Sequence, residues 1–366
     1  MILIYAQIIT SYLSTCSVNG KEFARTFLLK RPLSSDKETL SISSALRAIG
    51  CESDARVVEV ARGKWWLQCH KSSVKAVYFF LKAKDISKII SLCETTVSKV
   101  IHAVQRDFDG LNIKLSPKFP PYMNINPSEY YQRNFTGYTL AESIKEATDI
   151  LGCMGIDSFE YNSMEIMQMS QFICKEAYFL YCYVRIIINF KSIPHPNDLG
   201  SEKYKSIVSN FLDSSNCLSI LLSRKVAPLR FWLHLLELSV WLQNKYEINI
   251  NTINNNIDID QNIDFVVPKS IFSKIDSYML MVSLDRLATS FVSDELCSDV
   301  SQSEINSVRL KLVNLWSLAL IQSNAENYQK QEDAENEKLE YNKSKTNFRE
   351  SNALKLPRAI DLITSI

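Results

Sequence analysis

Glycine is scarce in this chain, occupying only 8 of 366 positions, and this scarcity limits what the chain can fold into. Few glycines imply few tight turns, which a fold built from many short strands would need. Proline is grouped in connectors such as SPKFPP (116–121) and IPHP (193–196). Long stretches without either breaker favour helices. The sequence therefore predicts an all-α protein.

Apolar residues recur at helical spacing along most of the chain. The predicted helices cover 42–49, 55–66, 73–81, 86–91, 96–108, 140–151, 164–190, 204–222, 229–246, 270–292 and 303–323. The most apolar run, 177–190, contains Arg185 and is too short and too charged to cross a bilayer, so we expect a buried helix. The Ile- and Asn-rich stretch 247–268 is predicted to be a low-complexity loop, and 324–366 a polar tail.

Composition excludes several classes of function. The formal net charge is +1, so any affinity for nucleic acid must come from cations clustered on one face. The 9 cysteines include no C-x-x-C pair, which excludes a zinc ribbon and fits the reduced thiols of the cytosol or nucleus. Histidine spacings, phosphate loops and nucleophile elbows typical of enzymes are lacking. We expect no catalysis, no metal, no cofactor and no membrane partner.

Residues 85–101 (DISKIISLCETTVSKVI) resemble a helix-turn-helix. One helix is predicted at 85–91 and a second at 96–108, with a polar break at 92–94. Apolar side chains would form the inner face of both helices, among them Ile86, Ile89, Ile90, Val97, Val100, Ile101 and Val104. The opposite face would carry donors for phosphate oxygens and base edges. The predicted DNA-binding residues are Lys84, Lys88, Thr95, Thr96, Ser98, Lys99, His102 and Arg106.

The surroundings of this segment are locally basic. From Arg62 to Arg106 the chain has nine Lys and Arg residues against two carboxylates, although the formal net charge of the whole chain is only +1. The alternative is an ordinary solvated helix surface, where Lys is common. Trp65 and Trp66 have the right chemistry to stack on bases, although paired aromatics in a helix are more often core. Trp232 and Trp241 similarly predict either a partner-binding groove or a core helix.

A modest internal repeat relates 42–54 to 144–157. Five positions match at one offset: Ile42/Ile144, Ala45/Ala147, Ile49/Leu151, Gly50/Gly152 and Cys51/Cys153. The repeat indicates either a duplicated helical domain of common size or a chance likeness between two helix ends.

The segment from 70 to 108 is similar to the distal helices of a cyclin-like repeat in the transcription factor IIB family. Positions that carry the resemblance are Ser72, Ala76, Tyr78, Asp85, Ile86, Ser87, Leu92, Thr96 and Val97. Val57, Val58 and Ala61 would then lie on the inner face of a preceding helix. The resemblance implies two five-helix repeats, and the expected organisation is an N-terminal segment (1–40), repeat 1 (41–115), a linker (116–138), repeat 2 (139–246), the loop at 247–268, C-terminal helices (269–323) and the tail.

By this resemblance the protein would be a nuclear, non-enzymatic general transcription initiation factor. Its partners would be duplex DNA, a TATA-binding protein and RNA polymerase, although the chain lacks the family's N-terminal zinc ribbon. The smallest subunit of the origin recognition complex has cyclin-like repeats without a ribbon, so origin recognition subunits are the alternative partners. A third alternative is an α-helical protein-interaction scaffold that binds no nucleic acid.

Overall fold

The computed structural model describes most of the chain. Its described residues are 8, 11–12, 15–16, 18–107, 139–156, 173–192, 201–256, 268–293, 303, 305–325 and 327–328. Every regular element within these ranges is a helix, which confirms the predicted all-α class. The predicted linker at 116–138 lies wholly outside the described residues, as does most of the polar tail.

The helices occupy the stretches that lack internal proline. Their bounds are α2 (Val18–Leu29), α3 (Asp36–Ala48), α4 (Glu52–His70), α5 (Ser73–Ala83), α6 (Ile86–Asp107), α8 (Leu140–Cys153), α9 (Lys175–Lys191), α10 (Ser201–Ser223), the short 3₁₀ helix η4 (Leu229–Phe231), α11 (Trp232–Asn256) and α12 (Lys274–Ser293). Residues 305–325 form a further helix.

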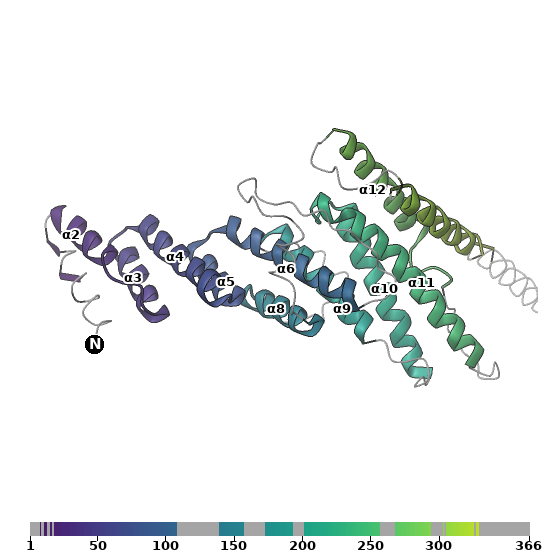
Figure 1. Ribbon diagram of the computed structural model, residues 1–366, viewed down its shortest axis with the longest axis horizontal. Helices are drawn as coiled ribbons and strands as arrows, with labels where there is room; N and C mark the ends of the chain where they lie inside the picture. The colour runs from purple at the N-terminus through teal and green to yellow at the C-terminus, as the bar shows by residue number, and fades with distance from the viewer. Residues whose placement is uncertain are drawn as a thin grey trace, which may run out of the picture.

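The helices stack side by side along one long axis, from α2 at one end to α12 near the other (Figure 1). Helix α3 packs between α2 and α4, and α4 packs in turn on α5. Helix α6 contacts α5, α8 and α9, after which α10 joins α9 to α11 and α12. Because most contacts join helices that are close in sequence, the molecule is an elongated array, as in helical solenoids.

Two apolar cores stabilise the array. The first belongs to α2, α3 and the start of α4, and consists of Ala24, Leu28, Ile42, Ala45, Leu46, Ile49, Ala55 and Val58. The second, which we call the main core, runs from Ala76 in α5 to Leu315 in the last helix. Helix α9 lies within the main core, and all its residues from Ala177 to Ile187 are buried, as predicted for 177–190. Helices on both sides of the predicted linker share this core, and the cyclin-like repeats stay a prediction.

The ends of α3 and α8 show why the internal repeat was misleading. Helix α3 ends at Ala48. Gly50, two residues beyond, has a left-handed φ of 81°, and the amide of Cys51 donates to Leu46 O. The residue in the same conformation after α8 is Gly155, with φ 82°. Gly152, the sequence match of Gly50, lies inside α8. The five matched positions therefore do not share a structural register.

Helix α11 extends further than predicted, because the loop assigned to 247–268 is helical up to Asn256. No glycine or proline interrupts this stretch, and Ile250 packs against the main core. The Asn249 side chain donates to Lys245 O at 2.8 Å, so this residue satisfies its amide within the helix. The prediction of a loop gave more weight to the high content of Asn and Ile than to the absence of glycine and proline. It was wrong for 247–256.

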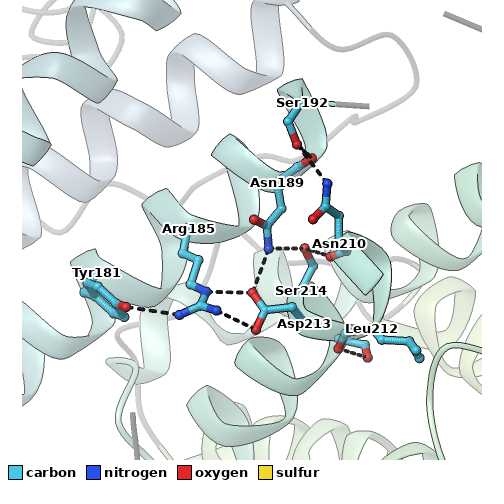
Figure 2. A network of polar contacts seen from close by, with 9 residues as sticks. Tyr181, Arg185, Asn189, Ser192, Asn210, Leu212, Asp213 and Ser214 are labelled. Carbon is cyan, nitrogen blue, oxygen red and sulfur yellow. Dashed lines mark hydrogen bonds and ion pairs between the residues drawn. The ribbon is translucent and has the colours of Figure 1, made fainter. Parts of the chain in front are cut away.

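A polar network joins α9 to α10 (Figure 2). The Arg185 guanidinium donates through Nε to Asp213 Oδ2 at 2.6 Å and through Nη2 to Oδ1 at 2.8 Å. Its Nη1 donates to the Tyr181 hydroxyl at 3.1 Å, and the Asn189 amide donates to Asp213 Oδ2 at 2.7 Å. The single charge in the apolar run 177–190 is thus neutralised by a carboxylate from the next helix, the condition under which a buried charge is tolerated.

Close packing of α4 on α5 depends on Gly63. A Cβ atom added at Gly63 would lie 2.5 Å from Cε1 of Phe80, closer than carbon atoms approach in folded proteins. The Phe80 side chain is fully buried in the main core, so its ring has no open space to move into.

Replacing Gly63 by Ala is expected to lower the free energy of unfolding by up to about 2 kcal/mol. Alanine gains about 1 kcal/mol of helix propensity over glycine, but overpacking a core costs about 1–3 kcal/mol. Urea unfolding followed by circular dichroism measures the change. Adding Phe80→Leu makes room for the new methyl group, so the double variant should lose less than the two single losses combined. A stabilised Gly63→Ala variant would show that the two helices separate at little cost.

Candidate functional site

The predicted helix-turn-helix is a single helix. Residues 86–107 form α6 without interruption, and the expected break at 92–94 lies in its middle. Leu92 and Cys93 are buried there, continuing the apolar stripe between Ile89 and Val97. With no turn there is no second helix to place in a DNA groove, and this prediction was wrong.

Three hydroxyl groups expected to contact DNA bond within α6 instead. The hydroxyls of Thr95, Thr96 and Ser98 donate to the carbonyl oxygens of Ser91, Leu92 and Glu94, at 2.7, 2.8 and 2.9 Å. Thr96 is buried, and the other two are partly buried. These side chains therefore satisfy their hydrogen bonds locally, as serine and threonine in a helix commonly do.

The remaining predicted DNA-binding residues do not form one exposed face. The Lys99 ammonium group donates to both carboxylate oxygens of Glu146 in α8, at 2.9 and 3.0 Å, and its side chain is 13% exposed. His102 is partly buried. Lys84, Lys88 and Arg106 are exposed, but Lys88 and Arg106 lie about 27 Å apart along α6. The expectation of one exposed donor face was wrong, because α8 and α9 pack on α6.

The tryptophans of the basic segment are held by contacts within the protein. Arg62 and the Trp66 indole N–H both donate to Asp36 Oδ1, at 2.6 and 2.8 Å. The Arg62 guanidinium carbon lies 3.9 Å from a Trp65 ring centroid, and the Lys75 ammonium lies 3.9 Å from Trp66. The hydrogen bonds to Asp36 tie α4 to α3, and the Lys75 contact ties it to α5, so they favour the structural interpretation of the pair over base stacking.

A groove opens where α4 passes the corner between α5 and α6. Its volume is about 650 Å³. We call it the corner groove, and its lining residues are Arg56, Val57, Val60, Ala61, Lys64, Ala83, Lys84, Asp85, Ile86 and Ser87. The volume lies within the range typical of ligand-binding sites. Lys84 is the predicted DNA-binding residue that lines it.

The corner itself arises from two local conformations. Lys84 ends α5 with a left-handed φ of 56°, and the amide of Asp85 donates back to Phe80 O at 3.0 Å. The Asp85 carboxylate then accepts the amide of Lys88 at 3.2 Å, which caps the start of α6. The left-handed conformation of Lys84 turns the chain at the end of α5, and the Asp85 cap lets α6 begin directly after the turn.

Two apolar residues of the corner groove were predicted to be buried. Val57 and Ile86 were placed on inner helix faces, yet they are 64% and 49% exposed, and Ala61 is also exposed. Val58 is buried, as predicted. Apolar side chains that stay exposed after the helices pack indicate an interaction surface. Sequence periodicity alone does not predict that Val57 is exposed and its neighbour Val58 is buried.

The proximity of two histidines, the buried His234 and the partly buried His102, was not predicted. The Tyr183 hydroxyl and His234 Nε2 lie 2.7 Å apart in the main core, joining α9 to α11. Burial lowers the pKa of His234 to about 3, with a smaller contribution from nearby His102, and burial also lowers the pKa of His102. His102 and His234 come from helices far apart in sequence, so no spacing motif could have paired them.

The partner groove expected around Trp232 and Trp241 is occupied by the protein's own core. Trp232 is buried and its indole N–H donates to Ala227 O at 2.9 Å. Trp241 is partly buried against the main core, with its ring centroid 4.6 Å from that of Phe190. These residues support the core-helix alternative.

The described residues were compared with the requirements of a metal site and of a membrane-spanning helix. Within those ranges, no three His, Cys, Asp or Glu side chains gather closely enough to hold a metal ion. No described helix is long and apolar enough to cross a membrane. Comparisons with models of known protein families and with curated proteins find no match to the chain. A functional proposal therefore rests on the geometry of the corner groove alone.

Proposed function

We propose that this protein is a non-enzymatic α-helical scaffold that binds partner proteins along its array. The observation that carries the proposal is the corner groove, an open surface with exposed apolar residues on an elongated stack of helices. Stacked helices of this kind present a long surface whose shape does not depend on a bound ligand. Exposed apolar patches rimmed by polar residues mark sites of protein interaction.

A second candidate is a nuclear DNA-binding adaptor, the function implied by the resemblance to transcription factor IIB or to the origin recognition subunit. The supporting observation is a set of exposed lysines along α4, α5 and the start of α6: Lys64, Lys71, Lys75, Lys82, Lys84 and Lys88. Such lysines can bind phosphates without reading sequence. This candidate ranks second because α6 is continuous and largely packed against other helices.

Purification of the tagged chain from its own cells after nuclease treatment tests the two candidates. A scaffold is expected to retain a protein partner at fixed stoichiometry through gel filtration. A DNA adaptor is expected to lose its complex on nuclease treatment and to bind duplex DNA in a fluorescence-anisotropy titration, with affinity that falls steeply as salt rises. The second result would contradict the scaffold.

A further inference from the structure

We propose that the corner groove binds an acidic peptide segment that carries at least one large apolar side chain. The proposal rests on the scaffold function and names the chemistry of its partner. Three features of the groove lead to it: an exposed apolar floor, a cationic rim, and carboxylates that are already engaged within the protein.

The apolar floor is formed by Val57 from α4 and Ile86 from α6. Their side chains are 64% and 49% exposed, and Val60 and Ala83 lie between them as more deeply buried lining. These residues come from α4 and from the start of α6, and they line the same groove. A large apolar side chain placed there would remove apolar surface from water on both partners.

The rim is cationic. Arg56, Lys64 and Lys84 line the groove, against the single carboxylate of Asp85. Arg56 forms an exposed ion pair with Glu52 at 3.2 Å, whereas neither Lys64 nor Lys84 forms an ion pair with any described residue. The two exposed lysines therefore present positive charge on either side of an apolar floor.

The carboxylates near the groove form contacts within the protein. Glu59 in α4 is fully buried and bound by both terminal nitrogens of Arg47 at 2.7 Å, and Glu52 pairs with Arg56. The Asp85 carboxylate accepts the Lys88 amide. An acidic segment would thus meet a lining in which three cations outnumber one carboxylate, and complementary charge would set its orientation and favour its association.

The same features make a peptide a better occupant than nucleic acid or a small molecule. Phosphate backbones are bound through charge, and they would gain little from exposed Val57 and Ile86. The groove lies open at Lys64 and Lys84, whereas sites for small ligands bury most of the ligand surface. An acidic amphipathic segment matches both the floor and the rim.

A fluorescence-anisotropy titration of the full chain tests the proposal. The probe is a short fluorescein-labelled peptide of Asp, Glu, Leu and Phe. Two comparison peptides replace either its carboxylates by amides or its Leu and Phe by Ser, and a labelled DNA duplex is the third comparison. We expect the acidic apolar peptide to bind at least about tenfold more tightly than either altered peptide.

Variants of the groove then locate the binding. Val57→Asp, and Lys64→Glu combined with Lys84→Glu, are each expected to weaken peptide binding by about tenfold or more. Matched controls lie elsewhere on the array: Ile275→Asp in α12, where the side chain is 74% exposed, and Lys311→Glu, which is also exposed. Both controls should leave the affinity unchanged.

The outcomes separate this proposal from the scaffold function. Equal binding of the acidic and neutral peptides, or equal loss in the control variants, would overturn the acidic-peptide proposal. Preferential binding of the duplex, lost in the lysine variants, would overturn it in favour of nucleic acid. If the groove variants lose neither the peptide nor the partner that copurifies with the native chain, the partner docks elsewhere: the scaffold stands and the groove proposal fails.

Discussion

Replacing Asp213 by Ala is expected to lower the local stability of α9 and α10 by about 3–5 kcal/mol. The change leaves the Arg185 guanidinium, which is 9% exposed, inside the protein without the carboxylate that accepts two of its hydrogen bonds. Removing one partner of a buried ion pair costs this much because the remaining charge stays desolvated. Hydrogen exchange of the α9 and α10 amides measures the loss directly, without assuming that the elongated array unfolds as one unit.

Two controls sharpen this prediction. Asp285→Ala breaks an ion pair with Arg309 whose side chains are 66% and 42% exposed, and should change stability by less than about 1 kcal/mol. The double variant Arg185→Met with Asp213→Leu removes both charges and should recover most of the loss, because apolar residues of similar volume need no neutralisation. A loss from Asp213→Ala no larger than that from Asp285→Ala would show that water reaches Arg185.

Acidification from pH 6.5 to pH 4.5 is expected to cost about 2 kcal/mol of stability through His234 alone. Burial depresses the pKa of this histidine to about 3 in the folded protein, whereas the unfolded chain has the ordinary value of 6.5. Above pH 6.5 both states are neutral and the stability is fully present. As the pH falls below 6.5 only the unfolded chain takes up the proton, so stability is lost by about 1.36 kcal/mol per unit until the folded pKa is reached.

The variant His234→Gln isolates this contribution. It keeps a neutral polar side chain near the Tyr183 hydroxyl but cannot titrate, so its unfolding free energy should depend less on pH between 6.5 and 4.5 than that of the native chain. Urea unfolding at several pH values gives both slopes. Parallel slopes would mean that His234 is protonated as readily in the folded protein as in the unfolded chain.

Helix positions were predictable because they depend on local chemistry. Long stretches without glycine or proline became helices at nearly every expected place, and 177–190 became a buried helix despite Arg185. The same rule, applied strictly, would have joined 85–91 to 96–108, since no glycine or proline lies between Ile86 and Asp107. Polar residues near the middle of an amphipathic helix were mistaken for a turn.

Which helix faces pack was not predictable, because that depends on neighbours distant in sequence. Lys99 looked like a solvent-facing donor until α8 supplied Glu146 to pair with it. Val57 has the apolar chemistry of a core residue, but among the described residues no helix covers its side of α4, and its side chain is 64% exposed. Likewise, His102 in α6 and His234 in α11 lie close together only because the fold brings these two helices, distant in sequence, near each other.

The separate core of α2, α3 and α4 has a consequence for how the protein is made. These helices bury Leu28, Leu46 and Val58 against one another using only residues near the N-terminus. During synthesis they can therefore fold as soon as they leave the ribosome, before the main core has been translated. Later helices then add in chain order, each onto a surface that already exists, and the nascent protein never has to hold its whole apolar content exposed at once.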